Sequence, residues 1–220
     1  MTPMTTQIKV CGFLDPDNAR MAVEMGADFL GLNFYARSPR YVGPGRAREI
    51  ADAVRGRTTL VGVFVNPSPD EVRDAVDRVG LDLVQLSGDE PSAPFAPFAG
   101  RTLKVFRSGG DPGPEAIAPW GDSWGLLFDA PHGSLYGGTG AAWSYETLVC
   151  SEGAAEHLAG RRVFLAGGIG PGNARQAVET VRPFAVDVCS RVESTPGFKD
   201  PELLRRLFEE VRNAQVQTAP

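Results

Sequence analysis

The chain has 220 residues, of which 42% are hydrophobic and 22% are charged. This balance is typical of a globular protein and excludes a chain that is disordered throughout. The 22 Lys and Arg residues against 27 Asp and Glu residues give a net charge of −5, so neither nucleic acid nor an anionic membrane is an expected partner.

The three cysteines are widely spaced, which argues against a disulfide framework and favours a reducing compartment. No apolar run is long enough to span a bilayer, and the first residues lack the pattern of a signal peptide. We therefore expect a cytoplasmic protein. No His and Cys residues have the spacing of zinc ligands, so we predict no metal site.

Short apolar segments rich in β-branched residues alternate with segments of helical pattern along the chain. The segment 58–65 is nearly all apolar, as expected for a parallel strand that is buried on both faces. Strands are predicted over residues 8–13, 27–35, 58–65, 81–88, 102–107, 124–130, 162–168 and 184–189.

Helices are predicted between these strands. One begins after Asp15, which precedes a proline, and the next ends near Val54. A capping-box sequence predicts a helix that starts at Ser68. Apolar residues at helical spacing predict a last helix from Asp200, with a frayed tail after Asn213.

The other connections have weaker signals. The segment 90–100 is broken by prolines and holds at most a short helix, and 111–119 holds a weak one. A glycine-rich loop over 132–140 could move as a lid, and the stretch from there to residue 160 should contain a helix. Residues 172–181 are predicted to be helical.

Alternation of strand and helix implies a parallel sheet, and eight such units imply a closed (β/α)8 TIM barrel with some short or degenerate helices. The rival fold, an open doubly wound sheet, usually carries a glycine fingerprint after its first strand, which this chain lacks. No linker divides the chain. We therefore predict a single domain over residues 1–220, with its core at about 8–212.

In such a barrel the active site lies at the carboxyl ends of the strands. Because side chains alternate along a strand, Lys9 and Cys11 face the interior if Val10 packs outward. By the same alternation Asp187 and Cys189 face inward on the eighth strand, which neighbours the first, so Asp187 can pair with Lys9. The Lys9 ammonium would lower the pKa of the Cys11 thiol, which favours a catalytic thiolate. The alternative is a small buried hydrophobic residue.

Other polar or flexible residues follow the later strands. Asp129 ends an apolar strand, where a carboxylate is costly unless it is paired or functional; alternatively it caps a loop amide. Gly167 and Gly168 can bring the backbone close to an anion, with Ser190 as a further donor, or they only form a turn. Arg40 suits a carboxylate or a phosphate, and the alternative is a solvated surface residue.

Nine sequence blocks, in order from Lys9 to Asp200, resemble those of the phosphoribosylanthranilate isomerases of tryptophan biosynthesis. They are KVCGF, SPRYV, GVFVN, VQLSGDE, LLFDA, YGGTG, LAGGI, VRPFAVDV and VESTPGFKD. The resemblance implies a (β/α)8 barrel without cofactor. It also implies an Amadori rearrangement of a small phosphoribosyl substrate, N-(5-phosphoribosyl)anthranilate, to 1-(o-carboxyphenylamino)-1-deoxyribulose 5-phosphate. This reaction is an aldose–ketose isomerisation by general acid–base catalysis.

The same resemblance implies a role for each matching residue. Cys11 is the implied general base, and Asp129 is the implied general acid. The implied binding residues are Arg40 at the anthranilate carboxylate, Gly167, Gly168 and Ser190 at the phosphate, and Asp187 in the substrate pocket.

Four positions depart from the residues common in that family, one of which is Cys189 in place of a serine. Arg191 replaces a glycine, and its side chain either adds a contact to the phosphate or fills part of the site. Ser87 replaces a histidine and Asn33 an apolar residue, which keeps open a diverged paralogue acting on another phosphoribosylamine or phosphosugar. Further alternatives are a Schiff-base aldolase using Lys9 or Lys104, and a phosphosugar-binding protein without turnover. The sequence is compatible with a monomer or a homodimer.

Overall fold

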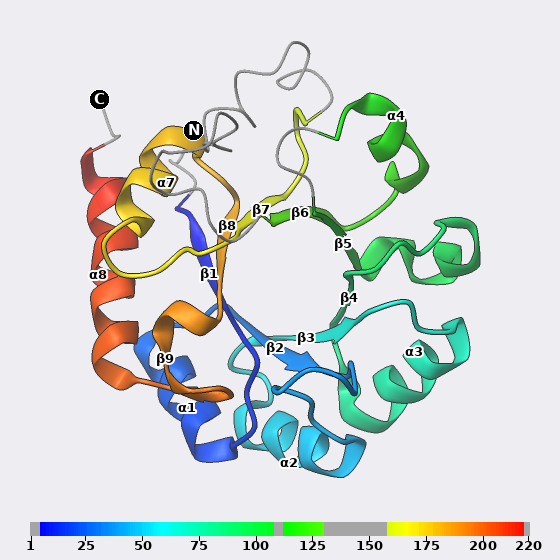
Figure 1. Ribbon diagram of the computed structural model, residues 1–220, viewed down its shortest axis with the longest axis horizontal. Coiled ribbons are helices and arrows are strands. Elements are labelled where there is room, and N and C mark those ends of the chain that lie inside the picture. Colours follow the sequence, from blue (N-terminus) through cyan, green and yellow to red (C-terminus); the bar gives the residue numbers. More distant parts are fainter. Residues whose placement is uncertain (1–4, 108–111, 130–157, 218–220) are drawn as a thin grey trace.

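Eight parallel strands close into a barrel (Figure 1). The computed structural model describes residues 5–107, 112–129 and 158–217. Each strand is hydrogen-bonded to the next, and β8 pairs with β1 to complete the ring. The strands are β1 Gln7–Cys11, β2 Phe29–Asn33, β3 Thr59–Phe64, β4 Leu83–Leu86, β5 Thr102–Phe106, β6 Gly125–Asp129, β7 Val163–Ala166 and β8 Ala185–Val188. The predicted barrel is confirmed.

Helices surround the barrel on its outside (Figure 1). After β4 and β5 the chain forms 3₁₀ helices and one short α-helix, because prolines interrupt the α-helical hydrogen bonds there. The α-helices are α1 Pro16–Met25, α2 Pro44–Val54, α3 Pro69–Ala75, α4 Pro114–Ile117, α7 Ala174–Val181 and α8 Pro201–Gln217. A π-helical turn covers Val76–Gly80, and 3₁₀ helices cover Ala93–Arg101, Ala118–Trp120 and Ser190–Val192.

Local sequence determines where the first and third helices begin. The Asp15 side chain accepts a hydrogen bond from the Asn18 amide (2.9 Å) at the start of α1. At the start of α3, the Ser68 hydroxyl accepts from the Glu71 amide, and the Glu71 carboxylate accepts from the Ser68 amide. Both predicted helix starts are confirmed.

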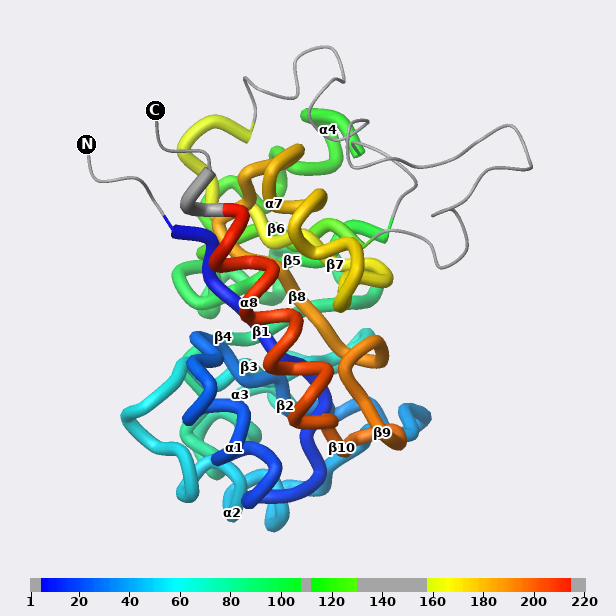
Figure 2. Tube along the Cα trace, turned by 90° about the vertical axis from the view of Figure 1, so that its left-hand side faces the viewer, coloured from blue at the N-terminus to red at the C-terminus, as the bar shows by residue number. Residues whose placement is uncertain are grey.

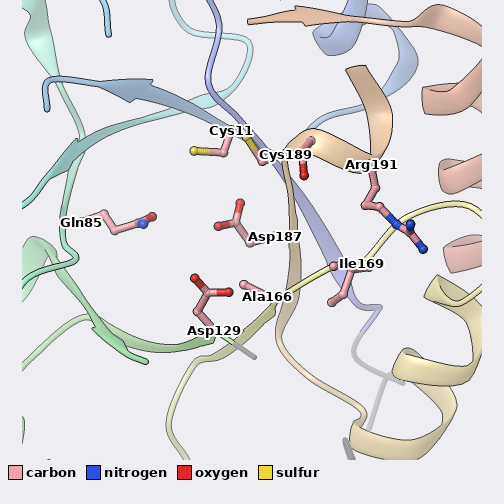
Figure 3. A pocket seen from close by; sticks show the side chains of 11 residues that line it. Cys11, Gln85, Asp129, Ala166, Ile169, Asp187, Cys189 and Arg191 are labelled. Carbon is pink, nitrogen blue, oxygen red and sulfur yellow. The ribbon is translucent and has the colours of Figure 1, made fainter. Parts of the chain in front are cut away.

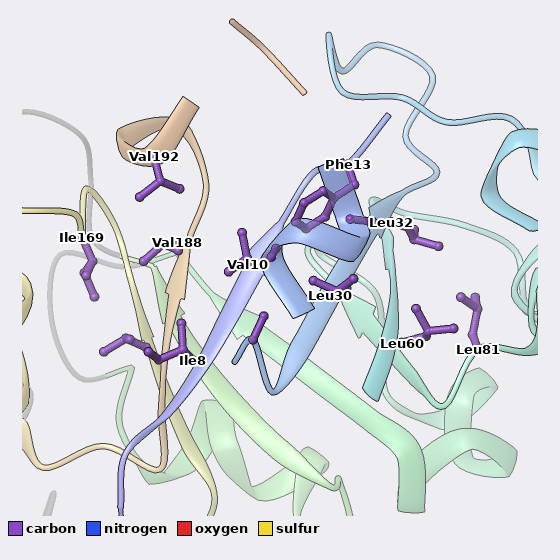
Figure 4. Packing of buried hydrophobic residues seen from close by; sticks show 14 of the residues in the cluster. Ile8, Val10, Phe13, Leu30, Leu32, Leu60, Leu81, Ile169, Val188 and Val192 are labelled. Atoms are coloured by element: carbon purple, nitrogen blue, oxygen red, sulfur yellow. The ribbon is translucent and has the colours of Figure 1, made fainter. Parts of the chain in front are cut away.

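The outward faces of the strands pack against the helices. Figure 4 shows Ile8, Val10 and Leu30 in this layer, where Val10 and Leu30 are fully buried. Val10 therefore faces outward as predicted. Because the strand alternates, Lys9 and Cys11 face inward.

An aromatic cluster fills the amino-terminal end of the barrel interior. Phe29 and Phe164 pack with ring centroids 5.2 Å apart, and Trp124 lies 5.9 Å from each of them. Phe184 contacts the same three rings. All four residues lie near the start of a strand. The cluster therefore fills the barrel interior at the end opposite the carboxyl ends of the strands.

Two helical segments differ from the sequence prediction. Residues 90–100 contain most of a nine-residue 3₁₀ helix, Ala93–Arg101, in which Phe95 and Phe98 are buried. Helix α8 continues to Gln217 instead of fraying after Asn213, because Val211 and Ala214 remain buried. Burial of its apolar face thus extends this helix.

A two-stranded hairpin follows β8 and is absent from the sequence prediction. It consists of β9 Glu193–Thr195 and β10 Phe198–Lys199. Figure 2 shows the hairpin beside the start of α8. The predicted glycine-rich loop over 132–140 and the predicted helix before residue 160 lie outside the described residues. Within the part of the chain that is described, no helix combines the length and apolar character needed to cross a bilayer.

Candidate active site

The Cys11 thiol lies at the carboxyl end of β1 and faces the barrel interior. The residue is only 8% exposed. Its register partner on β2 is Gly31, and a Cβ atom on Gly31 would lie 2.6 Å from the Cys11 Sγ. Glycine at this position therefore leaves the room that the thiol occupies.

An ion pair lies beneath Cys11 in the barrel. Lys9 Nζ donates to Asp187 Oδ1 at 2.9 Å, and the two residues are register partners across β1 and β8. Burial lowers the pKa of the fully buried Lys9, but the charges of Asp187 and Cys11 outweigh burial and raise it. Lys9 therefore remains an ammonium, and the predicted pair is confirmed.

The Cys11 and Cys189 thiols are neighbours at the ends of the first and last strands, and the Cys189 Sγ donates to Glu193 Oε1 at 4.0 Å. The neighbouring Cys189 thiol has the largest effect on Cys11; burial opposes it, and the Lys9 ammonium assists it, so the pKa of Cys11 falls from 9.0 to about 7. The nearby Cys11 and burial raise the pKa of Cys189, which stays protonated. Lys9 lowers the pKa of Cys11 as the sequence predicts, but the neighbouring Cys189 thiol, which the sequence prediction did not include, contributes more.

Glu193, the first residue of β9, holds two cations at the rim above these thiols. Its carboxylate accepts from Arg40 Nε at 2.8 and 3.1 Å and from Arg40 Nη2 at 2.5 Å. It also accepts from Lys199 Nζ at 2.6 Å, and this ammonium lies 3.9 Å from the Cys189 Sγ. Burial raises the pKa of Glu193, but the bonds from Arg40 and Lys199 outweigh burial and lower it. The ionised carboxylate thus fixes both side chains.

Arg40 lies at this rim and is the one predicted site residue that does not line the central cavity. Its side chain crosses Gly12, where a Cβ atom would lie 2.6 Å from Arg40 Cδ. Gly12 has a φ of +84°, a conformation that also favours glycine. Glu193 engages Nε and Nη2 of Arg40, and the third guanidinium nitrogen, Nη1, can hold a carboxylate of a ligand.

A cavity of about 170 Å³ opens at the carboxyl ends of the strands. Figure 3 shows Cys11, Gln85, Asp129 and Asp187 pointing into one space from different sides. Among the described residues, no group of three His, Cys, Asp or Glu side chains is placed to hold a metal ion. The predicted site residues that line the cavity are Cys11, Asp129, Gly167, Gly168, Asp187, Ser190 and Arg191.

Asp129 is the last residue of β6 and is partly exposed to the cavity. Its register partner on β7 is Ala166, whose small side chain also lines the cavity. Figure 3 shows the Asp129 carboxyl group across the cavity from Cys11. The two predicted catalytic residues therefore reach the same space from β1 and β6.

The ends of β7 and β8 form the third side of the cavity. Gly167 and Gly168 have φ angles of +95° and +69°, which bring bare backbone to the cavity wall. Arg191 packs against Gly170, where a Cβ atom would lie 2.5 Å from Arg191 Cβ. Figure 3 shows the Arg191 guanidinium pointing away from Asp187. Arg191 thus lines the cavity, while its guanidinium lies away from the centre of the site.

The structure adds Gln85, Glu193 and Lys199 to the predicted site. Strand alternation could have indicated Gln85, because its neighbours Val84 and Leu86 belong to the outward layer. The scarcity of lysine in the sequence could have drawn attention to Lys199. The chain has three lysines, all of them buried in ion pairs: Lys9, Lys104 and Lys199.

Residues 8–210 match the family model described as N-(5'-phosphoribosyl)anthranilate (PRA) isomerase. The chain belongs to this family. It is 42% identical over 207 residues to the N-(5'-phosphoribosyl)anthranilate isomerase of Citrifermentans bemidjiense, covering 94% of this chain and 97% of that one. The corresponding isomerase of Bordetella parapertussis is 38% identical over 217 residues, covering 96% and 97%.

Solved structures of phosphoribosylanthranilate isomerases have the same fold. The Thermotoga maritima structure superposes with a TM-score of 0.82 at 32% identity, covering 95% of this chain and all (100%) of that one. A second isomerase structure, in complex with reduced 1-(o-carboxyphenylamino)-1-deoxyribulose 5-phosphate, has a TM-score of 0.81 at 30% identity, with coverage of 95% and 100%. The barrel described above is thus that of the phosphoribosylanthranilate isomerases.

Proposed function

We propose that this protein isomerises N-(5-phosphoribosyl)anthranilate to 1-(o-carboxyphenylamino)-1-deoxyribulose 5-phosphate. One observation carries the proposal: the Cys11 thiol and the Asp129 carboxyl group line one cavity from opposite sides. Acid–base catalysis of this rearrangement needs two such groups, one on each side of the sugar. The relatives from Citrifermentans and Bordetella carry the isomerase name.

The reaction begins with an acid and continues with a base. Asp129 donates a proton to the ribose ring oxygen, the bond from that oxygen to C1 breaks, and the lone pair of the anthranilate nitrogen forms a C1=N iminium. The Cys11 thiolate then removes the proton from C2, and the C–H electron pair forms the C1=C2 bond of an enolamine. Tautomerisation gives the ketone at C2, so the aldose becomes a ketose by intramolecular oxidoreduction, without a cofactor.

The environment of Cys11 supports its role as base. A pKa of about 7 makes roughly half of the thiol ionised at neutral pH, where an ordinary thiol is almost fully protonated. A base whose pKa lies near the working pH combines a large reactive fraction with useful basicity. The protonated Cys189 stabilises the thiolate without competing for the C2 proton.

The remaining predicted residues provide the binding groups of this proposal. Arg40 holds the anthranilate carboxylate at the rim through the part of its guanidinium that faces away from Glu193. The backbone at Gly167 and Gly168, with Ser190, binds the phosphate, and Arg191 adds positive charge nearby. Asp187 lies between the two ends of the substrate and is held by Lys9.

In this proposal, residues 1–220 form one domain that acts as a monomer or a homodimer. The Thermotoga maritima isomerase is described as dimeric, and monomers of it have also been generated.

The test is an isomerase assay on purified protein, with phosphoribosylanthranilate generated in the cuvette and followed by the loss of its fluorescence. Cys11→Ala and Asp129→Asn should each reduce kcat by about 10²- to 10⁴-fold. Asp89→Asn, which changes an exposed carboxylate outside the cavity, is the matched control and should leave kcat unchanged. Near-normal turnover by either site variant would remove that residue from the mechanism, and a folded but inactive wild type would favour a diverged paralogue or a binding protein.

The Schiff-base alternative is disfavoured by the surroundings of both lysines. A lysine must be neutral to attack a carbonyl carbon. Lys9 donates to Asp187, and its pKa is raised. Lys104 Nζ donates to Glu90 at 2.6 Å and to the Gly88 carbonyl oxygen at 2.7 Å, and both bonds are buried. Borohydride reduction in the presence of substrate should therefore trap no lysine adduct.

A further inference from the structure

One buried amide in the cavity has no role in the acid–base mechanism. Gln85 lies in the middle of β4, and its backbone neighbours Val84 and Leu86 pack outward against the helices. The Gln85 side chain therefore points inward, and Figure 3 shows its amide directed toward Asp129 and Asp187. The residue is 6% exposed, on a strand where the next inward side chain is the apolar Leu83.

The hydrogen bonds of this amide are incomplete. Gln85 Nε2 donates to the Ser87 Oγ at 3.1 Å. Gln85 Oε1 is buried and has no hydrogen-bond partner among the described residues. Every other buried side-chain nitrogen or oxygen of the described residues has a hydrogen-bond partner. A buried carbonyl oxygen without a donor destabilises a folded protein, so its presence in a site needs an explanation.

The missing hydrogen-bond donor to Gln85 Oε1 can come from the substrate. The other groups that reach this space, Cys11, Asp129 and Asp187, are proton-transfer groups or anions. A substrate held by its phosphate at β7 and β8 and by its carboxylate at Arg40 places its ribosyl chain between these ends. The hydroxyl groups of that chain are the donors that reach the centre of the cavity.

We propose that Gln85 is a substrate-binding residue whose Oε1 accepts a hydrogen bond from a ribosyl hydroxyl, thereby orienting the C2 hydrogen toward Cys11. This inference rests on the proposed function, because it uses the substrate and its orientation. Ser87 has a supporting role, since its hydroxyl holds Nε2 and so turns Oε1 toward the cavity.

The first variant is Gln85→Met, which keeps the length of the side chain and removes the amide. It should lower kcat/KM for phosphoribosylanthranilate by about 10- to 100-fold, the effect of losing a hydrogen bond to the reacting molecule. Its Tm should equal or exceed that of the wild type, because the unpartnered carbonyl is gone. A purely structural glutamine would show the reverse, with a lower Tm and unchanged kinetics.

Two further variants keep the test decisive. Gln85→Asn retains an amide but withdraws its carbonyl by one methylene, and it should show the same loss if the methionine variant fails to fold. Ser87→Ala leaves Gln85 intact but frees its orientation, so kcat/KM should fall less, by about two- to fivefold. An unchanged kcat/KM in a folded Gln85→Met or Gln85→Asn variant overturns the proposal.

Binding measurements separate this inference from the proposed function. Calorimetry with ribulose 5-phosphate, which carries the hydroxyl groups, should show at least tenfold weaker binding to Gln85→Met than to the wild type. Inorganic phosphate, which lacks them, should bind both proteins equally. Failure of the wild type to isomerise phosphoribosylanthranilate would refute the function but leave this difference measurable, and equal affinity of both proteins for ribulose 5-phosphate would refute the role of Gln85.

Discussion

The thiol of Cys189 can be removed without changing the strand that carries the proposed base. In Cys189→Ala the Cys11 thiolate loses the neighbouring thiol that contributes most to its lowered pKa. Burial and the Asp187 carboxylate, which raise the pKa, then outweigh the Lys9 and Lys199 ammonium groups, which lower it. The pKa of Cys11 should therefore rise from about 7 to 9.0 or above.

The size of the effect follows from this return. A rise from about 7 to 9.0 lowers the thiolate fraction at pH 7 from one half to about 1%, or about 50-fold. The value of kcat/KM at pH 7 should then fall by at least about 50-fold, and the loss should disappear as the pH rises above the new pKa.

The assay is the pH dependence of kcat/KM, which reports ionisations of the free enzyme. Activity should increase with pH through the pKa of Cys11, with a midpoint near 7 in the wild type and at least about two units higher in Cys189→Ala. Cys189→Ser is the matched control, because a hydroxyl group can still donate to the thiolate, and its midpoint should stay near that of the wild type. An unshifted midpoint in folded Cys189→Ala would refute the reasoning.

Two further predictions concern stability. Glu193→Gln leaves the buried Lys199 ammonium without its counter-ion and should lower the free energy of unfolding in urea by about 3–5 kcal/mol. The pKa of Glu193 in the folded protein lies below 4.5, so the ionised carboxylate stabilises the fold at neutral pH. This stabilisation is lost as the pH falls through the folded-state pKa. The difference in unfolding free energy between Glu193→Gln and the wild type should therefore disappear in acid. A gap below about 1 kcal/mol at neutral pH would mean that solvent screens the pair. Ser68→Ala removes half of the capping box of α3 and should cost about 1 kcal/mol while kcat stays unchanged; an unchanged urea midpoint would show that the cap does not stabilise the fold.

The parts of the site that sequence could predict are those governed by short periodicities. Alternation along one strand indicates that Lys9 and Cys11 share a face, and the same rule applies to Asp187 and Cys189. Closure of eight strands makes the first and last strands neighbours, so the ion pair between Lys9 and Asp187 follows from topology. Helix starts at capping sequences were predictable for the same reason, because a cap is a local hydrogen bond.

The parts that sequence could not predict depend on irregular backbone or on competing effects. Lys199 and Glu193 lie in a hairpin whose turn bears no periodic signal, and their positions relative to Arg40 follow from tertiary packing. The larger effect of Cys189 on Cys11 depends on how closely the two thiols approach, whereas Lys9 acts through charge from one layer below. Alternation indicates that Gln85 points inward, but its unpartnered oxygen becomes evident only once its surroundings are known.

The pairing of β1 with β8 has a consequence for the newly made chain. Lys9 and Asp187 are separated by 178 positions, and Cys11 and Cys189 lie just beyond them on the same strands. While the ribosome is still making the last strand, Cys11 has no neighbouring thiol and behaves as an ordinary cysteine. The rate at which a small alkylating reagent modifies Cys11 at neutral pH would therefore report, during synthesis or refolding, the moment at which the two ends of the chain meet.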